Sequence, residues 1–329
     1  MPKPRRNQIA LSATPYYHCI SRCVRRAFLC GKDAHTGRCF EHRRGWIEQR
    51  LLKLAGIFAI DIAAYAVMSN HLHLVLHINT TTSQSWTQTD IIHRWHALFA
   101  GNSLSKRAVK GETLGLFEQT LLNRYTATWQ ARLTDISWFM RCLNEPIARL
   151  ANREDQATGR FWEGRFKTQA LLDEQALMAC MAYVDLNPIR AKMASTPESS
   201  DFTAIQRRIL HLQTAVSDHT NLQPPELMPF VGNPREDMPA GLPFRLQDYI
   251  ECVDWTGRVL RSDKRGAIAA STPSVLNRLG ISAENWLALA QSFGSKMGYF
   301  AGVKDSVIHL KETLKLKRVR TQGCGLFST

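Results

Sequence analysis

The stretch VMSNHLHLVLHI, residues 67–78, decides the fold of this chain. From His71 onward leucine or isoleucine alternates strictly with histidine or valine, which is typical of a β-strand with one buried face. His71 and His73 share a face and lie roughly 7 Å apart along the strand at ~3.3 Å per residue. Two imidazoles at this spacing can bind one small cation, although histidine pairs also occur on exposed strands without a metal. The buried face is expected to carry Leu72, Leu74, Leu76 and Ile78.

The charge balance of the 329-residue chain favours an anionic partner. Lys and Arg number 42 against 28 Asp and Glu, a net charge of +14, and this excess indicates nucleic acid before a membrane surface. No apolar run has the length of a membrane span, so no membrane partner is expected. The basic segment Met1–Asn7 is followed by no apolar signal core, which predicts a cytoplasmic, unprocessed protein.

The eight scattered cysteines suit a reducing compartment. Four of them near the N-terminus raise the hypothesis of a zinc site. No pair among the four has the two-residue spacing of a zinc ribbon or knuckle, so buried free thiols are the favoured interpretation. The four are Cys19, Cys23, Cys30 and Cys39.

The N-terminal part of the chain predicts the order β-α-β-β. A strand over residues 15–22 precedes a helix over 42–54, and an apolar β-prone segment over 57–67 leads through a turn into the histidine strand. Residues 79–134 are interpreted as an insertion that carries two helices, around 91–99 and 117–132. Asp135 then caps a further helix with an apolar stripe.

Two later segments carry candidate functional residues. Residues 158–172 interleave cationic and aromatic side chains, which suits single-stranded nucleic acid as well as a solvated basic edge. Asp173 begins another helix, on which Tyr183 and Asn187 lie one turn apart on the same face. Pro188 predicts that this helix ends at Asn187 and leaves the Asn187 side chain at an open terminus.

The rest of the chain is predicted to be mainly helical. A helix over residues 205–216 leads to a proline-rich connector over 223–243, and two short helices meet at Gly280. The expected domains are 1–200 with the site and the insertion, 201–243 as helix and linker, and 244–329 as a basic helical C-terminal region.

Three segments in this order resemble a known family. They are Asn70-His71-Leu72-His73, Gly164-Arg165-Phe166-Lys167, and the run from Tyr183 through Asn187-Pro188 to Ala191. The combination resembles the single-tyrosine HUH transposases, especially the branch associated with repetitive extragenic palindromes, over roughly residues 15–197. The resemblance implies an α+β fold built on a ferredoxin-like βαββαβ domain, here with a helical insertion and the C-terminal region as departures.

The resemblance also implies a chemistry. Tyr183 would be the nucleophile that attacks single-stranded, hairpin-bearing DNA and forms a 5′-phosphotyrosine intermediate, and His71, His73 and Asn187 would hold Mg²⁺ or Mn²⁺. The activity expected is transposition by cleavage and rejoining of DNA strands, by a monomer or a homodimer. The DNA-binding surface is expected to comprise Arg22, Arg25, Arg26, Arg160, Trp162, Arg165, Lys167 and Arg190.

Three other functions remain open at this point. The chain could be a regulator that binds structured DNA without cutting it, or a metal-dependent nuclease in which water attacks and Tyr183 only packs. A regulator stabilised by zinc on the N-terminal cysteines is the third alternative. Covalent attachment of DNA to protein separates the transposase from all three.

Overall fold

The computed structural model describes residues 8–24, 30–31, 37–215, 223–232, 241–261 and 273–327. It has a mixed α+β architecture, as expected from the sequence. The chain divides into two compact units. The first comprises Met1–Gly45, Ile62–Leu76 and Trp162–Thr329, and the second comprises Trp46–Asp61 and His77–Phe161.

A five-stranded mixed sheet forms the framework of the first unit, in the order β2-β3-β1-β4-β5. β1 runs antiparallel to β4, with His18 opposite Gln169, whereas β4 and β5 are parallel. The predicted strands in the first half of the chain are confirmed, but the C-terminal strand β5 was not predicted. The bounds are β1 Tyr16–Arg22, β2 Ile60–Val67, β3 His71–Ile78, β4 Lys167–Leu171 and β5 Phe300–Ala301.

Strand β3 is buried on both faces, which corrects the expectation of one exposed face. Its leucines lie in the core as predicted, but His73 is only 3% exposed and Val75 is fully buried. The His73 side of the strand is covered because the Tyr183 ring, from helix α7 (Glu174–Asp185), lies against His73. Phe293, from helix α12 (Ala283–Lys296), lies against the neighbouring His18 ring of β1. His73 therefore lies in a protected site, whereas His71 at the start of the strand is only half-buried.

Helix α7 begins where the sequence predicted, but it ends earlier. The Asp173 side chain caps it by accepting a hydrogen bond from the Ala176 N–H at 2.9 Å. The helix ends at Asp185, and a short helix α8 (Asn187–Arg190) follows. The predicted end at Asn187 was wrong because Pro188 lies in the first turn of α8, where a missing N–H costs nothing. Asn187 is consequently buried, at 8% exposure.

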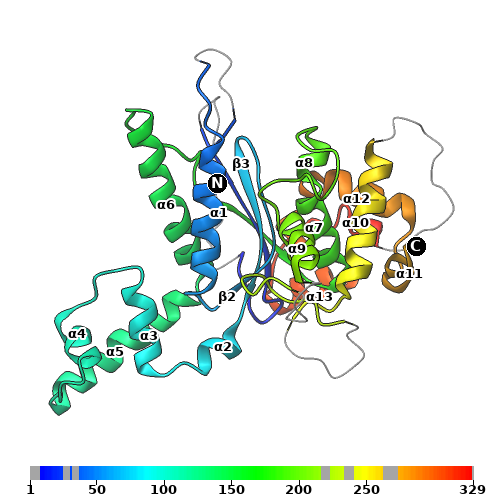
Figure 1. Cartoon of the computed structure of the whole chain (residues 1–329). Helices are drawn as coiled ribbons and strands as arrows, with labels where there is room; N and C mark the ends of the chain where they lie inside the picture. Colours follow the sequence, from blue (N-terminus) through cyan, green and yellow to red (C-terminus); the bar gives the residue numbers. More distant parts are fainter. Residues whose placement is uncertain are drawn as a thin grey trace. The chain divides into compact units, whose positions relative to one another are not determined.

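Several helices of the first unit gather on one side of the sheet (Figure 1). The predicted pair of helices that meet at Gly280 is confirmed, with this glycine in the left-handed region at φ 64°. No helix of the described residues is long and apolar enough to cross a membrane. Besides α7, α8 and α12, these helices are α9 (Ala204–Ala215), α10 (Leu246–Arg261), α11 (Ser274–Leu279), α13 (Lys304–Thr313) and the 3₁₀ helix η2 (Cys324–Phe327).

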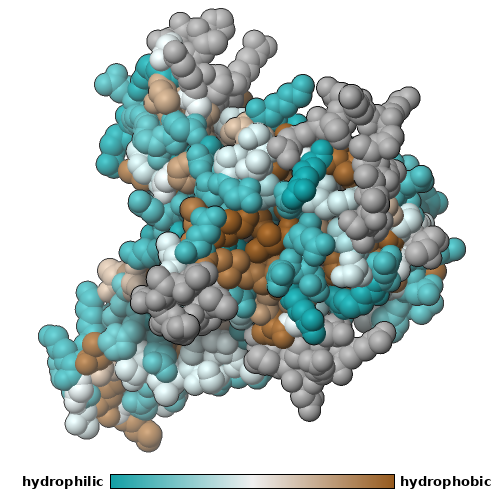
Figure 2. All heavy atoms as spheres, turned by 45° about the vertical axis from the view of Figure 1, so that its right-hand side comes forward, coloured by the Kyte–Doolittle hydropathy of each residue, from teal (hydrophilic) through white to brown (hydrophobic). Residues whose placement is uncertain are grey.

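The second unit is helical, as predicted, but residues 79–134 carry four helices where the sequence predicted two. Arg50 on α1 donates to the Cys142 carbonyl of α6 at 3.0 Å, and Phe58 and Phe139 pack with ring centroids 5.2 Å apart. On the face shown in Figure 2, apolar side chains gather in the middle of the view, and hydrophilic side chains cover much of the rest. The helices are α1 (His42–Ala55), α2 (Thr80–Gln84), α3 (Gln88–His96), α4 (Ser103–Val109), α5 (Leu116–Leu133) and α6 (Ile136–Glu154).

A buried polar cluster ties α7 to α9 and α10. Asp185 accepts hydrogen bonds from the Tyr249 hydroxyl at 2.6 Å and from the Ile205 N–H at 3.2 Å. Arg208 lies close enough to act on it electrostatically. Burial raises the pKa of Asp185 to about 7, although Tyr249 and Arg208 oppose this rise. Because the neutral carboxyl is favoured in the folded state, Asp185 makes stability depend on pH.

The Asp185→Asn variant is expected to remove this dependence. An unfolded Asp has a pKa of ~3.9, so between about pH 4 and 7 the folded chain holds a proton that the unfolded chain has released. The stability from Asp185 is therefore fully present below about pH 4 and is lost as the pH rises towards 7. Urea unfolding at about pH 5 and pH 8 should show the wild type losing about 2 to 3 kcal/mol relative to the variant. An unchanged difference between the two proteins would contradict this role.

Candidate active site

Tyr183 and two of the three histidines of β3, His71 and His73, line one hollow of about 260 Å³ in the first unit. The ring of Tyr183 on α7 lies edge-on to that of His73, with centroids 5.7 Å apart. The rings of His71 and His73 are 4.8 Å apart. Residues separated by more than a hundred positions in sequence are thus brought to one place.

A chain of hydrogen bonds fixes the proton positions on His73. The amide Nε2 of Gln169 donates to the Gly298 carbonyl at 2.6 Å, so its Oε1 faces His18 Nδ1 at 3.3 Å. His18 must donate there because Oε1 only accepts, which leaves its Nε2 as the acceptor for His73 Nδ1 at 2.9 Å. His73 Nδ1 then carries the proton. Its Nε2 is left with a lone pair.

His71 reaches the same state through a different partner. Its Nδ1 lies 2.5 Å from the Asn70 side-chain oxygen, which only accepts, so Nδ1 carries the proton. The Nε2 lone pair of His71 is left available as well. Imidazoles that ligate metals commonly donate their other N–H to an oxygen in this way.

All three imidazoles are held neutral. Burial lowers the pKa of His18 to about 4, and burial together with the charges of Arg22 and Arg190 lowers the pKa of His71 to about 4. Burial, reinforced by His18 and the same cations, lowers the pKa of His73 well below its usual value. At neutral pH each ring therefore carries a single N–H, and the Nε2 lone pairs of His71 and His73 are left to accept a cation.

Arg190 holds the Tyr183 ring in place. Its guanidinium lies over that ring, 3.9 Å from the centroid, and donates to the carbonyls of Tyr183 at 3.1 Å and Gln291 at 2.7 Å. Burial lowers the pKa of Arg190, and Tyr183 partly opposes this. The predicted DNA-binding residue Arg190 is thus a half-buried cation that anchors the tyrosine to α12.

Gly294 of α12 lies directly against the Tyr183 hydroxyl. A Cβ at this position would come within 2.9 Å of the hydroxyl oxygen, closer than such atoms pack. Only a glycine therefore leaves the hydroxyl room to stay where it is. Nothing in the sequence pattern indicated this contact, because it depends on the packing of α12 against α7.

Asn187 is the third predicted metal ligand, and its surroundings differ from those of the histidines. It is absent from the residues that line the Tyr183 hollow, but its buried amide Nδ2 has no hydrogen-bond partner among the described residues. Nor do those residues include three or more His, Cys, Asp or Glu side chains arranged to hold a metal ion. The zinc hypothesis on the N-terminal cysteines therefore gains no support.

The other seven predicted DNA-binding residues differ in their surroundings. Arg22, Arg165 and Lys167 are exposed and line the Tyr183 hollow. Trp162 is half-buried and pairs through its backbone with Cys23, whereas the exposed Arg160 belongs to the other compact unit. Arg25 and Arg26 lie outside the described residues.

His18 and Gln169 are site residues that the sequence analysis missed. His18 lies within the predicted first strand and Gln169 within a segment that was expected to form a further strand. Their pairing follows from the register of β1 against β4, which neither segment reveals alone. A cross-strand pattern would have been the only available signal.

Comparisons with known proteins add little evidence about the family or the function of this chain. No protein-family model matches the chain, and no curated protein matches it. A solved structure of a REP-associated tyrosine transposase bound to a REP hairpin is similar at 12% identity and a TM-score of 0.36, over 73% of this chain and 97% of that one. At this TM-score the likeness carries no argument about fold or activity.

Proposed function

We propose that this protein is a single-tyrosine transposase of the HUH type, which cleaves and rejoins single-stranded, hairpin-bearing DNA. The observation that carries the proposal is the meeting of the Tyr183 ring with the His71 and His73 rings in one hollow, whose rim carries three cations and one carboxylate, Glu163. The resemblance of the three sequence segments agrees with it. The strand order β2-β3-β1-β4 supports the proposal that the framework is ferredoxin-like.

Tyr183 is proposed as the nucleophile. Its phenolic oxygen forms a bond to the scissile phosphorus while the bond to the 3′-oxygen breaks, which gives a 5′-phosphotyrosine ester and a free 3′-hydroxyl. The phenolic proton is released and the 3′-oxygen takes one up. Because the ester keeps the energy of the broken bond, rejoining by a 3′-hydroxyl needs no nucleotide cofactor.

His71 and His73 are proposed to hold Mg²⁺ or Mn²⁺ through their Nε2 atoms. These atoms keep their lone pairs because Nδ1 carries the proton in both rings. Asn187 would be the third ligand. Rotating its amide by half a turn would put Oδ1 at the buried position where Nδ2 now lacks a partner. When bound, the cation would polarise the scissile phosphate. The neutral state of both imidazoles suits them to this role.

The Gln169→Leu variant is expected to weaken Mn²⁺ binding about 10- to 100-fold. Leucine removes the acceptor for His18 Nδ1, so His18 can change tautomer and His73 Nδ1 is no longer obliged to carry the proton. Titration calorimetry with Mn²⁺ measures the affinity, and nitrogen NMR of the histidines reports the tautomers. Unchanged His18 and His73 tautomers in the variant would contradict the role of the hydrogen-bond chain from Gln169 through His18 to His73.

The DNA is proposed to lie along the exposed cations of the hollow, Arg22, Arg165 and Lys167. Cations on this rim neutralise phosphates and position the strand without reading sequence. Trp162, Arg160, Arg25 and Arg26 stay proposed DNA contacts.

Labelled oligonucleotides test the proposed function. Hairpin-bearing single strands labelled at either end are incubated with the protein and Mn²⁺, then separated on denaturing gels. The 3′-labelled strand should become attached to protein, and the 5′-labelled strand should be released shortened with a free 3′-hydroxyl. Cleavage without attachment would indicate a hydrolytic nuclease, and binding without cleavage a regulator. Either result would overturn the proposal.

A further inference from the structure

A second cavity adjoins the Tyr183 hollow and has no role in the chemistry proposed above. Its volume is about 520 Å³, within the range of ~300–1,000 Å³ usual for ligand pockets. The two hollows share the lining residues Ile20, Arg165, Lys167 and Gly294. A strand of DNA bound at Tyr183 would therefore pass directly into this cavity.

The C-terminal part of the chain builds one wall of the cavity. The Ala170 N–H donates to the Tyr299 carbonyl at 2.8 Å, and Gln169 holds the Gly298 carbonyl at 2.6 Å. β5 continues the contact by pairing with β4 in parallel. These bonds fix the backbone around Tyr299, while its side chain stays 44% exposed. The part of the wall around Tyr299 is thus held to the edge of the sheet.

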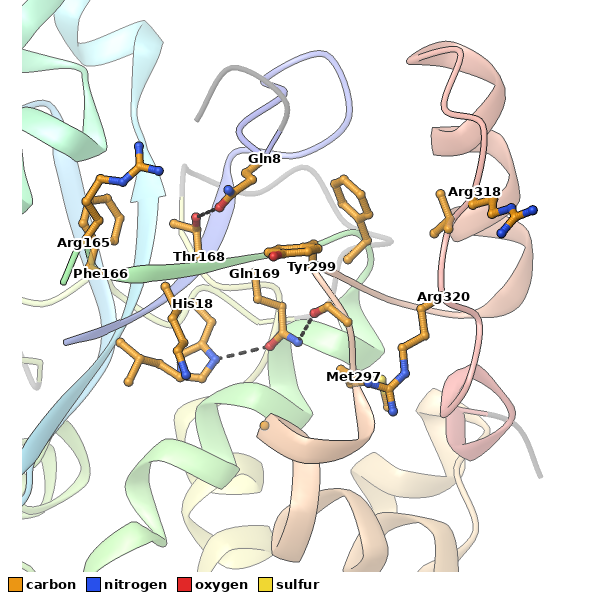
Figure 3. A pocket seen from close by; sticks show the side chains of 16 residues that line it. Gln8, His18, Arg165, Phe166, Thr168, Gln169, Met297, Tyr299, Arg318 and Arg320 are labelled. Atoms are coloured by element: carbon orange, nitrogen blue, oxygen red, sulfur yellow. Dashed lines mark hydrogen bonds between the residues drawn. The ribbon is translucent and has the colours of Figure 1, made fainter. Parts of the chain in front are cut away.

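The lining of this cavity includes several cationic and aromatic side chains. Arg165 and Phe166 approach from the segment before β4, Arg318 and Arg320 approach from the opposite side, and Tyr299 lies between them (Figure 3). None of the 16 lining residues is acidic. An aromatic ring flanked by cations is the arrangement that binds a nucleotide, because the ring stacks on the base and the cations contact the phosphates.

The geometry points to a subsite for one unpaired nucleotide of single-stranded DNA next to the phosphate that Tyr183 attacks. Its base stacks on Tyr299, and Arg318 and Arg320 contact the phosphates beyond it. This inference extends the proposed function and depends on it for the identity of the strand. It also gives the C-terminal region a task, which is to hold the flanking nucleotide in register with the tyrosine.

The test uses fluorescein-labelled hairpin oligonucleotides with single-stranded tails and the full-length protein. Tyr299→Ala is expected to weaken binding about 5- to 100-fold in anisotropy titrations, and Tyr299→Phe should retain wild-type affinity because it keeps the ring. Tyr125→Ala, at an exposed tyrosine of α5, is the matched control and should bind as wild type. Equal affinity of Tyr299→Ala and the wild type would overturn the inference.

The cations are tested through the salt dependence of binding. The double variant Arg318→Gln with Arg320→Gln should lower the slope of log affinity against log salt by about one to two. The control replaces two exposed arginines of the helical unit, Arg124 and Arg149, by glutamine. A slope change no larger than that of the control would overturn this part of the inference.

Abasic substitutions along the tails locate the nucleotide. At one position an abasic site should reproduce the loss seen for Tyr299→Ala, and the two changes together should cost no more than either alone. Additive losses at every position would overturn the stacking. Adduct formation is measured in parallel. If the protein becomes attached to DNA normally but the binding losses are additive at every position, the subsite alone is refuted. If one position shows non-additive losses but no covalent attachment to DNA occurs, the proposed function alone is refuted.

Discussion

A Tyr183→Phe variant is expected to lose covalent attachment to DNA by at least about 10³-fold, while its affinity for DNA stays close to that of the wild type. The change removes only the hydroxyl oxygen that would attack phosphorus. The ring keeps its packing against Phe293, at a centroid distance of 6.0 Å, and its place under the Arg190 guanidinium. Single-turnover assays with a labelled hairpin and Mn²⁺ measure the attachment.

The matched control is Tyr125→Phe, which alters an exposed tyrosine in the helical unit. It should attach DNA at the wild-type rate. Persistent attachment in the Tyr183 variant would mean that another residue is the nucleophile. Persistent cleavage without attachment would mean that water attacks, and Tyr183 would then be a packing residue beside His73.

The second large effect is expected for His71→Ala, which should slow strand cleavage about 10²- to 10⁴-fold in the presence of Mn²⁺ or Mg²⁺. His71 is the less buried of the two histidines, so its removal spares the contact between His18 and His73. The loss should appear in the rate of cleavage, and Mn²⁺ affinity measured by calorimetry should fall with it.

His77 supplies the control for this experiment because it lies on the same strand but contacts Asp61 and does not line the Tyr183 hollow. Its Nδ1 is 2.8 Å from Asp61 in the helical unit. The His77→Ala variant should cleave DNA at nearly the wild-type rate. A loss equal to that of His71→Ala would place the whole histidine strand in a structural role and remove the metal site from the account.

The sequence alone predicted the elements that carry a strong local signal. Alternation over His71–Ile78 located β3, and a capping Asp173 located the start of α7 and hence Tyr183. Both signals are local, since each depends on residues a few positions apart. The prediction that one face of β3 is exposed was wrong because the burial of a face depends on which helices pack over it.

The rest of the site depends on contacts that no local pattern encodes. β5 is a strand of only two residues, Phe300–Ala301, too short to show any period. The role of His18 follows from its register opposite Gln169. It also depends on the Gly298 carbonyl, 129 residues after Gln169, which accepts a hydrogen bond from the Gln169 amide and so orients it. Gly294 is fixed by its approach to the Tyr183 hydroxyl. Each of these becomes visible only when the sheet and α12 are assembled.

Identification of the residue that becomes attached to DNA tests the central claim most directly. The protein is trapped on a hairpin oligonucleotide in the presence of Mn²⁺, the DNA and the protein are digested, and the peptides are analysed by mass spectrometry. The account predicts that the tryptic peptide containing Tyr183 carries a nucleotide joined through its 5′-phosphate to the phenolic oxygen. A nucleotide on any other residue, or cleaved DNA with no modified peptide, would contradict it.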